Sequence, residues 1–273
     1  MNYLELSLKT EPDFAEILMV ELAEIGFESF TENEDGLEAY IQEEIFNEIT
    51  TKKLLEDYAA RTPLSYAIRK IEKQNWNAEW ENNYQPITIG DQILVRATFH
   101  KPQPNFPYEI VITPKMSFGT GHHETTSMVL ELQLGIDHKN KKVLDIGCGT
   151  GILAIMAAKL GASAVAAFDI DEWSAENSRE NIELNSTPEI VVRQGTIQQE
   201  PPETYDILLA NINRNILLEQ IPIYKTFLKK GGYLLVSGFY EHDAEDIIAA
   251  AAKVGLKKIK QISKNQWAAV VLR

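Results

Sequence analysis

The first 75 residues carry two different periods of apolar positions. Over Asn2–Leu8 apolar and polar residues alternate, which is typical of a half-buried strand. Between Phe14 and Ile25 the apolar residues recur every three or four positions, which predicts a helix that opens at Pro12 and stops at Gly26. The chain is therefore expected to begin with a strand followed by a helix.

Four more elements are predicted before residue 75. Two strand-like runs, Phe27–Glu32 and Leu37–Gln42, flank a sequence that ends in Asp-Gly, which favours a tight hairpin turn. A second helix is predicted over Ile45–Ala60 and a fourth strand over Leu64–Ile71. The order βαββαβ predicts a small ferredoxin-like α+β domain over residues 1–74.

From residue 86 onward, short apolar strands alternate with amphipathic helices. The predicted strands are Gln92–Ala97, Tyr108–Ile112, Lys142–Ile146, Ala164–Asp169, Ile190–Gln194, Tyr205–Ala210, Gly232–Ser237, Lys257–Ser263 and Gln266–Leu272. The predicted helices are Glu124–Gln133, Leu153–Leu160, Glu172–Leu184, Arg214–Leu228 and Asp243–Val254. Such alternation predicts a mostly parallel sheet with helices on both faces and a hairpin at its end. Residues 86–273 are therefore expected to form a Rossmann-like α/β domain.

Three aromatic residues, Trp76, Trp80 and Tyr84, separate the two regions. Residues that are four positions apart lie on one face of a helix. We therefore expect residues 75–85 to form a linker helix whose aromatic side chains pack between the domains rather than contact a substrate.

Charge is distributed unevenly along the chain. Residues 1–60 hold sixteen Asp and Glu against three Lys, a net charge of −13, whereas residues 76–273 hold 23 acidic and 19 basic residues, a net charge of −4. A negative field attracts cations and repels phosphate over roughly 8–10 Å. The first domain therefore suits a basic protein partner better than nucleic acid. The alternative is that these acids only keep a small domain soluble.

The sequence shows no sign of export or membrane insertion. It contains no run of eighteen apolar residues, and its N-terminus lacks a basic region followed by an apolar core. The single cysteine, Cys148, excludes an intramolecular disulfide. A cytoplasmic protein is therefore expected.

The most informative motif is a glycine-rich loop after a predicted strand. Gly147, Gly149 and Gly151 form the pattern G-x-G-x-G, whereas dinucleotide-binding folds use G-x-G-x-x-G, with a third glycine where Ile152 stands here. Asp145, just before the loop, would oppose a pyrophosphate but suits a cofactor with an ammonium and a sulfonium group. The D-x-G-x-G-x-G form resembles the first motif of class I methyltransferases that use S-adenosyl-L-methionine (AdoMet).

Polar residues end two further strands at the same edge of the predicted sheet. Asp169 is the candidate for accepting both ribose hydroxyls in a bidentate hydrogen bond, and Asp171 is expected to cap the following helix. Asn211 directly follows the predicted strand Tyr205–Ala210, beside the expected position of the cofactor methyl group. The alternative for Asn211 is that it caps the helix that follows.

A second glycine-rich segment spans residues 114–126 and reads P-K-M-S-F-G-T-G-H-H-E-T-T. His122, His123 and Glu124 suggest a metal site. However, adjacent histidines point to different sides of a helix or strand, and no other Cys or His cluster supports them. No metal is therefore expected.

The order of these motifs resembles that of the ribosomal protein L11 methyltransferase (PrmA) family. The matching strings are P-x-M-x-F-G-T-G-x-H-x-T-T at 114–126, D-I-G-C-G-T-G at 145–151 and A-N-I at 210–212. The resemblance covers essentially the whole chain. It implies a bacterial, cytoplasmic enzyme that transfers methyl groups from AdoMet to lysine ε-amines and to the N-terminal α-amine of ribosomal protein L11. It also implies that the first domain grips this substrate and that the linker lets the domain reposition over the active site.

The same resemblance assigns candidate cofactor contacts. These contacts are Thr126, Gly147, Gly149, Asp169 and Asn211, with Phe118, Gly119 and Thr120 in a loop expected to close over the methionine end. Asn211 is also the candidate catalytic residue, because its side chain would orient the amine.

Two departures from common class I patterns add expectations. No Pro-Pro-aromatic run follows Asn211, so this side chain and backbone carbonyls, rather than an aromatic wall, are expected to orient the amine. No acid occurs at 194–197, so the adenine is expected to rest on backbone N–H groups and apolar contacts. No dedicated general base is evident, and His122 or His123 is the candidate for a proton relay.

Three other functions fit parts of the sequence. A methyltransferase with another acceptor, such as a different basic protein, a small-molecule amine or RNA, would share the cofactor motifs, although the acidic balance disfavours RNA. A nucleotide-dependent oxidoreductase is disfavoured by the glycine spacing. A ribosome-assembly protein that binds AdoMet without turnover would keep every motif. No apolar surface stripe is evident, so a monomer is expected.

Overall fold

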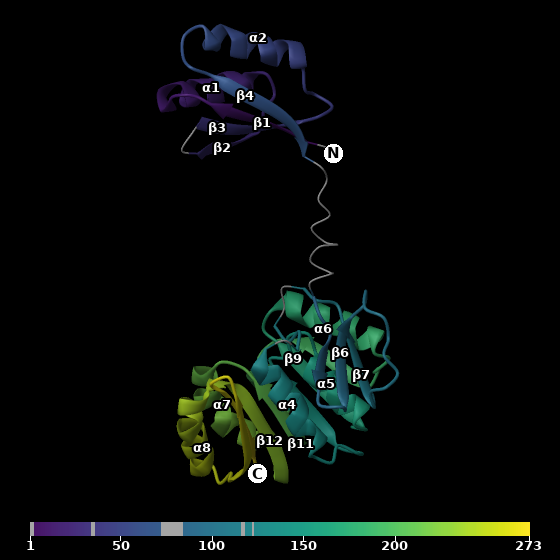
Figure 1. Ribbon diagram of the computed structural model, residues 1–273. Coiled ribbons are helices and arrows are strands. Elements are labelled where there is room, and N and C mark those ends of the chain that lie inside the picture. Colours follow the sequence, from purple (N-terminus) through teal and green to yellow (C-terminus); the bar gives the residue numbers. More distant parts are fainter. Residues whose placement is uncertain (1–2, 34–35, 72–83, 116–117, 122) are drawn as a thin grey trace. The chain divides into compact units, whose positions relative to one another are not determined.

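Figure 1 shows the computed structural model of the chain, which describes residues 3–33, 36–71, 84–115, 118–121 and 123–273. These residues belong to two compact units, Met1–Asn83 and Tyr84–Arg273. The predicted linker helix at 75–85 lies outside the described residues, except for its last two positions.

The N-terminal unit has a four-stranded antiparallel sheet. Its elements are β1 (Tyr3–Lys9), α1 (Pro12–Glu24), β2 (Ser29–Asn33), β3 (Gly36–Gln42), α2 (Glu48–Ala59) and β4 (Ser65–Ile71). The strand order is β2-β3-β1-β4, and both helices cover the same face of the sheet (Figure 1). The predicted ferredoxin-like fold is therefore confirmed.

The apolar positions of β1 and β3 explain why only one sheet face is covered. Leu6, Leu37 and Ile41 point to one side and are fully buried against Leu18 of α1 and Leu55 of α2. The residues between them along the strands point to the other face, because side chains alternate along a strand. The alternation seen in the sequence thus sets the packing of this unit.

Helix α2 begins three residues later than predicted. The Asn47 side chain accepts a hydrogen bond from Thr50 N at 3.1 Å and so caps the helix before Glu48. Ile45 consequently lies in the preceding turn and is 54 % exposed. A capping side chain, rather than the apolar period, determines where this helix starts.

The C-terminal unit is built on a seven-stranded sheet of order β10-β9-β8-β11-β12-β14-β13. Its strands are β8 (Lys142–Ile146), β9 (Ala164–Asp169), β10 (Ile190–Gln194), β11 (Tyr205–Asn211), β12 (Leu228–Tyr240), β13 (Lys258–Lys264) and β14 (Trp267–Leu272). Its α-helices are α4 (Glu124–Leu134), α5 (Ile152–Lys159), α6 (Glu172–Leu184), α7 (Arg214–Phe227) and α8 (Ala244–Lys253), with short 3₁₀ turns η1 (Ile197–Gln199) and η2 (Glu241–Asp243). Neighbouring strands are parallel except at β14, which is antiparallel to β12 and β13.

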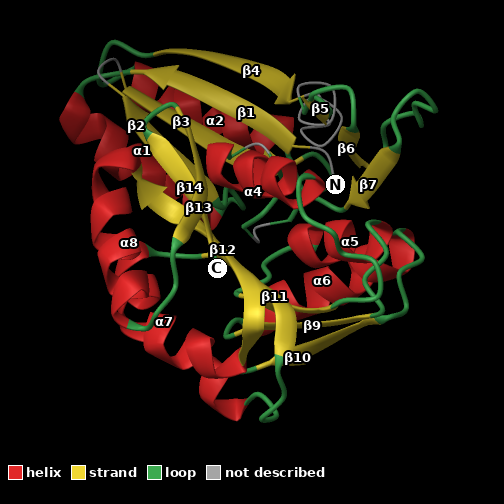
Figure 2. Ribbon diagram, turned by 90° about the horizontal axis from the view of Figure 1, so that it is seen from below, coloured by secondary structure: helices red, strands yellow, loops and turns green. Residues whose placement is uncertain are grey.

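Each face of this sheet has its own apolar core. Along β8, Val143 belongs to the core under α4, α5 and α6, whereas Leu144 and Ile146 belong to the core under α7 and α8. Figure 2 shows α7 and α8 on one side of β11 and β12, and α5 and α6 on the other. A parallel sheet that is covered on both faces is the predicted Rossmann-like architecture, which is confirmed.

A small separate sheet was not expected. It contains β5 (Ile87–Ile89), β6 (Ile93–Ala97) and β7 (Tyr108–Ile112), in that order. The sequence predicted β6 and β7 as strands but did not separate them from the large sheet, because apolar spacing does not say which strands pair. Arg96 of β6 and Glu109 of β7 join the strands through hydrogen bonds of 2.7 and 3.2 Å.

No helix in the described ranges is long and apolar enough to cross a membrane.

Candidate active site

The candidate site lies where the strand order of the large sheet reverses, between β8 and β11. Ligands of doubly wound sheets bind outside the carboxyl ends of the strands at such a point. A pocket of about 560 Å³ opens there, and it is lined by Gly147 and Gly149 after β8, Asp169 at the end of β9 and Asn211 at the end of β11. The structure therefore brings four of the predicted site residues together.

The loop after β8 requires glycine at two positions. Gly147 and Gly149 have positive φ angles of 69° and 55°. A Cβ on Gly147 would lie 2.5 Å from Ile212 Cγ2, and a Cβ on Gly149 would collide with the carbonyl oxygen of Phe118. The neighbouring segments thus pack directly on the loop backbone, and no loop side chain fills the pocket at these positions.

Asp169 is held by two backbone N–H groups. Its Oδ2 accepts from Gly149 N at 2.9 Å, and its Oδ1 accepts from Asp171 N at 3.0 Å. Each carboxylate oxygen has a further lone pair available, and the side chain lines the pocket. Asp169 can therefore accept two ribose hydroxyl groups while it anchors the glycine loop. Asp171 caps α6 as predicted, by accepting from Ser174 N at 2.9 Å.

Asn211 has one satisfied and one unsatisfied polar atom. Its Nδ2 donates to Thr126 Oγ1 at 3.2 Å, whereas its buried Oδ1 has no hydrogen-bond partner among the described residues. An unpaired buried carbonyl is costly, so it indicates a ligand donor. The alternative that Asn211 caps the next helix is wrong, because Asn213 caps α7 by accepting from Asn215 N at 2.9 Å.

Thr126 lies behind Asn211 rather than in the pocket wall. It is fully buried on α4 and is not among the residues that line the pocket. Its hydroxyl fixes the orientation of the Asn211 amide, so that the carboxamide oxygen stays available.

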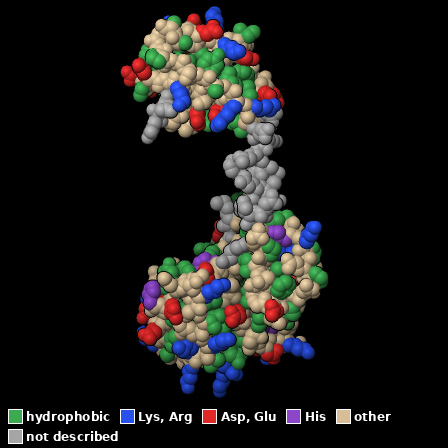
Figure 3. Space-filling view, viewed as in Figure 1, with side chains coloured by type: hydrophobic (Ala, Val, Ile, Leu, Met, Phe, Trp, Pro, Cys, Tyr) green, Lys and Arg blue, Asp and Glu red, His purple; other side chains and the backbone are tan. Residues whose placement is uncertain are grey.

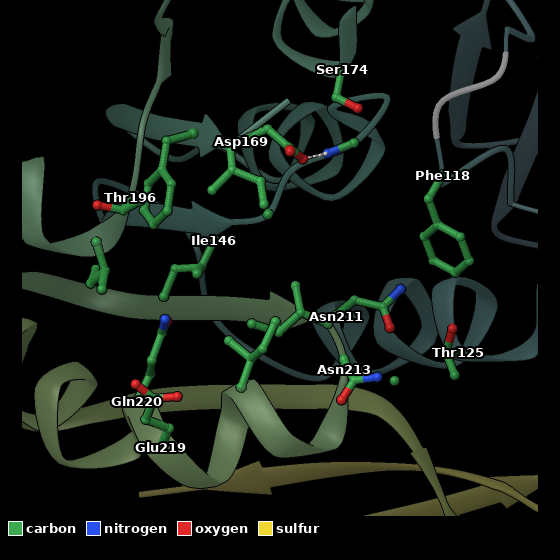
Figure 4. Close-up of a pocket in the computed structure, with 18 of the residues that line it drawn as sticks. Phe118, Thr125, Ile146, Asp169, Ser174, Thr196, Asn211, Asn213, Glu219 and Gln220 are labelled. Atoms are coloured by element: carbon green, nitrogen blue, oxygen red, sulfur yellow. Dashed lines mark hydrogen bonds between the residues drawn. The ribbon is translucent and has the colours of Figure 1, made fainter. Parts of the chain in front are cut away.

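Of the three loop residues expected at the methionine end, only Phe118 lines the pocket. Gly119 instead holds this segment against the glycine loop, because its carbonyl accepts from Thr150 Oγ1 at 2.5 Å. Thr120 is half-buried and does not line the pocket. Figure 4 shows Phe118 and Thr125 at one end of the pocket, with the Asn211 side chain extending toward them.

An aromatic wall is present, contrary to the expectation. The Phe118 and His123 rings are 5.3 Å apart between centroids, the His123 and Trp267 rings 4.6 Å, and the Trp267 and Tyr240 rings 4.2 Å. The first three of these residues line the pocket. The expectation failed because it considered only the residues after Asn211, whereas this wall comes from the segment before α4 and from the start of β14.

His123 is poorly suited to act as a proton relay. Its Nδ1 accepts from Thr125 N at 3.3 Å and lies 2.7 Å from Thr125 Oγ1, so His123 is the N-cap of α4. The Nδ1 lone pair is therefore engaged by the helix cap rather than available to the substrate amine. The other candidate, His122, lies outside the described residues.

Asp145 lies beneath the loop and does not line the pocket. Its Oδ2 accepts from Ala154 N at 3.0 Å, and its Oδ1 has no partner among the described residues. Burial raises the pKa of Asp145 to about 7. The sequence predicted that Asp145 would face the positively charged groups of the cofactor. This prediction is wrong, because Asp145 instead holds the start of α5 and does not line the pocket.

The pocket lining is partly apolar. Ile170 and Ile197 belong to it, together with Thr196 after β10. Two polar residues of α7, Glu219 and Gln220, also line the pocket and were not anticipated from the sequence. The signal that could have identified them is their position. They lie about two helical turns beyond Asn211, on the helix that follows β11.

The pocket residues fit AdoMet. Asp169 suits the ribose and the isoleucines suit a purine. Asn211, whose Oδ1 has no partner among the described residues, extends away from the end where Figure 4 shows Thr196. A pyrophosphate would be suited by Lys or Arg side chains, and neither occurs among the described residues that line the pocket. Across the ranges that the structure describes, no three His, Cys, Asp or Glu side chains are grouped to hold a metal ion.

Solved structures share this architecture. A ribosomal protein L11 methylase from Lactobacillus delbrueckii subsp. bulgaricus is 28% identical with a TM-score of 0.66, covering 70% of this chain and 98% of that chain. A methyltransferase from Pyrococcus furiosus, at 19% identity and a TM-score of 0.51, shares the fold over 60% of this chain and 87% of that chain. Fold and pocket together define a class I methyltransferase that uses AdoMet.

Within that class the particular family is also established. The family model described as Ribosomal protein L11 methyltransferase (PrmA) matches residues 7–273, and the chain belongs to this family. Relatives named ribosomal protein L11 methyltransferase from Phocaeicola vulgatus and Bacteroides fragilis are 44% and 45% identical. Both alignments cover 99% of this chain, and they cover 98% and 99% of the respective relatives.

Proposed function

We propose that this enzyme methylates lysine ε-amines and the N-terminal α-amine of ribosomal protein L11, with AdoMet as the methyl donor. The names of relatives that match over nearly the full chain support this substrate. The observation that carries the proposal is the Asn211 Oδ1, which has no partner within the described ranges, beside an aromatic wall, because this pair suits an amine that becomes a methylated cation.

The pocket addresses the main obstacle to amine methylation, which is protonation. Bound AdoMet supplies a methyl group on a positively charged sulfur. A free lysine amine has a pKa of about 10.4 and is mostly protonated at neutral pH, whereas apolar surroundings disfavour the cation. Phe118 and Trp267 provide such surroundings. Asn211 Oδ1 then accepts one amine N–H, which aims the nitrogen lone pair.

The aromatic rings also suit a substrate that is methylated more than once. Each methyl group added to an amine removes a hydrogen-bond donor, so the contact with Asn211 weakens. A methylated ammonium group is still attracted to the face of an aromatic ring. Phe118 and Trp267 therefore keep a binding surface for the partly methylated side chain.

The N-terminal unit is proposed to dock the substrate. Residues 1–60 carry a net charge of −13, and ribosomal proteins are commonly basic, so attraction would speed their encounter and weaken with salt. Helix α1 presents Ile17 and Val20, which are 45 % and 63 % exposed, among Asp13, Glu16 and Glu24. This combination offers both a charged and an apolar contact. The enzyme is proposed to act in the cytoplasm as a monomer.

The test is methylation of purified, unmodified ribosomal protein L11 with AdoMet, followed by intact-mass and peptide mass spectrometry. Mass gains in steps of one methyl group are expected, at lysines and at the N-terminus. At an AdoMet concentration that just saturates wild type, Asp169→Asn should strongly reduce the gain, whereas the matched change Asp171→Asn should keep it, because Asn also caps helices. AdoMet binding without any mass gain would contradict this substrate, and a whole-lysate screen would then identify the acceptor.

A further inference from the structure

We propose that Glu219 and Gln220 of α7 recognise the outer edge of the adenine of AdoMet, taking over from the acid that is missing after β10. The inference rests on the cofactor site described above, but not on the identity of the methyl acceptor. Adenine presents an exocyclic amino group that donates and a ring nitrogen beside it that accepts. A protein site that recognises this edge of the adenine therefore needs one hydrogen-bond acceptor and one donor.

The direction of the cofactor in the pocket follows from its two ends. The methyl group must face the amine site, where Asn211 and Phe118 lie. Asp169, which suits the ribose, lies between that end and the end where Figure 4 shows Thr196, Glu219 and Gln220. The purine must therefore occupy the end that contains the α7 residues.

The loop after β10 offers little to the amino group. No carboxylate occurs at 194–197. Gln199 Oε1 already accepts from Thr196 N at 2.8 Å, and Gln199 does not line the pocket. A carboxylate for the purine edge must therefore come from another element.

Helix α7 presents one face to the pocket and an apolar face to the core. Ile216, Glu219 and Gln220 line the pocket, and their spacing of three and four residues places them on one face. Leu217 and Ile221 are fully buried in the core under this helix. The buried face holds the helix in place, so the pocket-facing side chains are presented from a fixed support.

The two side chains supply the required pair of groups. Gln220 Oε1 accepts from the buried Tyr224 hydroxyl at 2.9 Å, which leaves the Gln220 amide N–H groups as the donors. Glu219 forms no hydrogen bond or ion pair with any described residue, and it lines the pocket. We assign Glu219 as acceptor for the exocyclic amine and Gln220 as donor to the ring nitrogen.

The test compares two non-reactive ligands by isothermal titration calorimetry. S-adenosylhomocysteine keeps the adenine edge, whereas S-inosylhomocysteine carries a carbonyl in place of the amine and an N–H in place of the ring acceptor. Wild-type protein should prefer the adenosyl ligand by roughly 30-fold, because the inosyl ligand mismatches both residues. Glu219→Gln should reduce this preference to a few-fold, since an amide can donate to the carbonyl.

Two further variants make the result specific. Gln220→Glu should also favour the inosyl ligand, because its carboxylate accepts the ring N–H and can still accept from Tyr224. The matched control Glu245→Gln, on α8 and outside the pocket, should keep the wild-type ratio. Thermal unfolding of every variant checks that it is folded.

An unchanged ratio in both Glu219→Gln and Gln220→Glu would overturn the assignment of these residues while leaving the cofactor site intact. Failure of the wild-type protein to bind S-adenosylhomocysteine would overturn both the assignment and the cofactor site. Because the readout is binding, a different methyl acceptor would not affect either result.

Discussion

The two units of this chain differ in how their charged and polar side chains are distributed. In the N-terminal unit the net charge of −13 is spread over residues 1–60, and Figure 3 shows its visible face with acidic and basic side chains and apolar areas between them. In the C-terminal unit a few side chains meet at the ends of β8, β9 and β11. The first unit should therefore tolerate single substitutions, and the second should not.

The largest effect is expected at Asp145, the buried acid under the glycine loop. Burial raises its pKa to about 7 from the usual value of 3.8, so between these pH values the folded protein holds a proton that the unfolded chain releases. Stability should therefore fall as pH rises from about 4 to about 7, by on the order of 4 kcal/mol from this group. Asp145→Asn should lose this dependence and gain stability over wild type across that window.

Urea unfolding at several pH values measures this effect. The exposed Asp91→Asn provides the control, because its stability curve should run parallel to that of wild type. If the Asp145→Asn curve also ran parallel to wild type, the charge state assigned to the buried acid would be wrong.

The next effect concerns the cofactor. Asp169→Asn places an amide where two backbone N–H groups need acceptors, and it weakens the ribose contact. Affinity for S-adenosylhomocysteine should fall roughly 100-fold, as expected for loss of hydrogen bonds to a charged group. Asp171→Asn should bind within twofold of wild type. Equal loss in both variants would mean that α6, rather than the carboxylate of Asp169, is what binding requires.

A smaller effect is expected at the aromatic wall. Trp267→Leu should slow the later methylation steps by roughly 10-fold, because a cation–π contact of about 1–2 kcal/mol is lost. Cofactor affinity should stay within twofold, and partly methylated product should accumulate in mass spectra. Trp173→Leu is the control, since Trp173 is 77 % exposed and does not line the pocket. A uniform decrease for every methyl group would contradict a role in binding the methylated cation.

The smallest single-residue effects are expected on α1. Neutralising Asp13, Glu16 and Glu24 together should lower kcat/KM about threefold at low salt, and each change alone less than twofold. The difference should vanish in high salt, because the attraction is screened. The same charge change in the C-terminal unit, at Glu176, Glu183 and Glu245, should have less effect. An equal effect from both triple variants would show that net charge, rather than the N-terminal unit, steers the substrate.

Local patterns were sufficient for most of the fold. The strands β9 and β10 and helix α6 have the predicted bounds, because buried strands and amphipathic helices leave their period in the sequence. The start of α2 was misplaced, because a short contact between Asn47 and Thr50 overrides the apolar period. The pairing of β5 to β7 was missed, because strand pairing depends on contacts between distant segments.

The sequence by itself determined the parts of the site that follow from position on a strand. Gly147, Gly149, Asp169 and Asn211 each end or follow a strand, and parallel strands end at one edge of a sheet. Their convergence could therefore be predicted from the order of the elements and from the parallel direction of the strands. The excess of acid in residues 1–60 is likewise a property of the sequence alone.

Only the tertiary structure decided which atoms remain free. Among the described residues, Asn211 Oδ1 has no hydrogen-bond partner, whereas Thr126, 85 residues away, holds the Asn211 Nδ2. Trp267 completes the aromatic wall because the antiparallel β14 returns beside β12. Asp145 is withdrawn from the pocket because the start of α5 covers it. Burial and hydrogen-bond saturation depend on contacts between distant segments, and no local pattern records them.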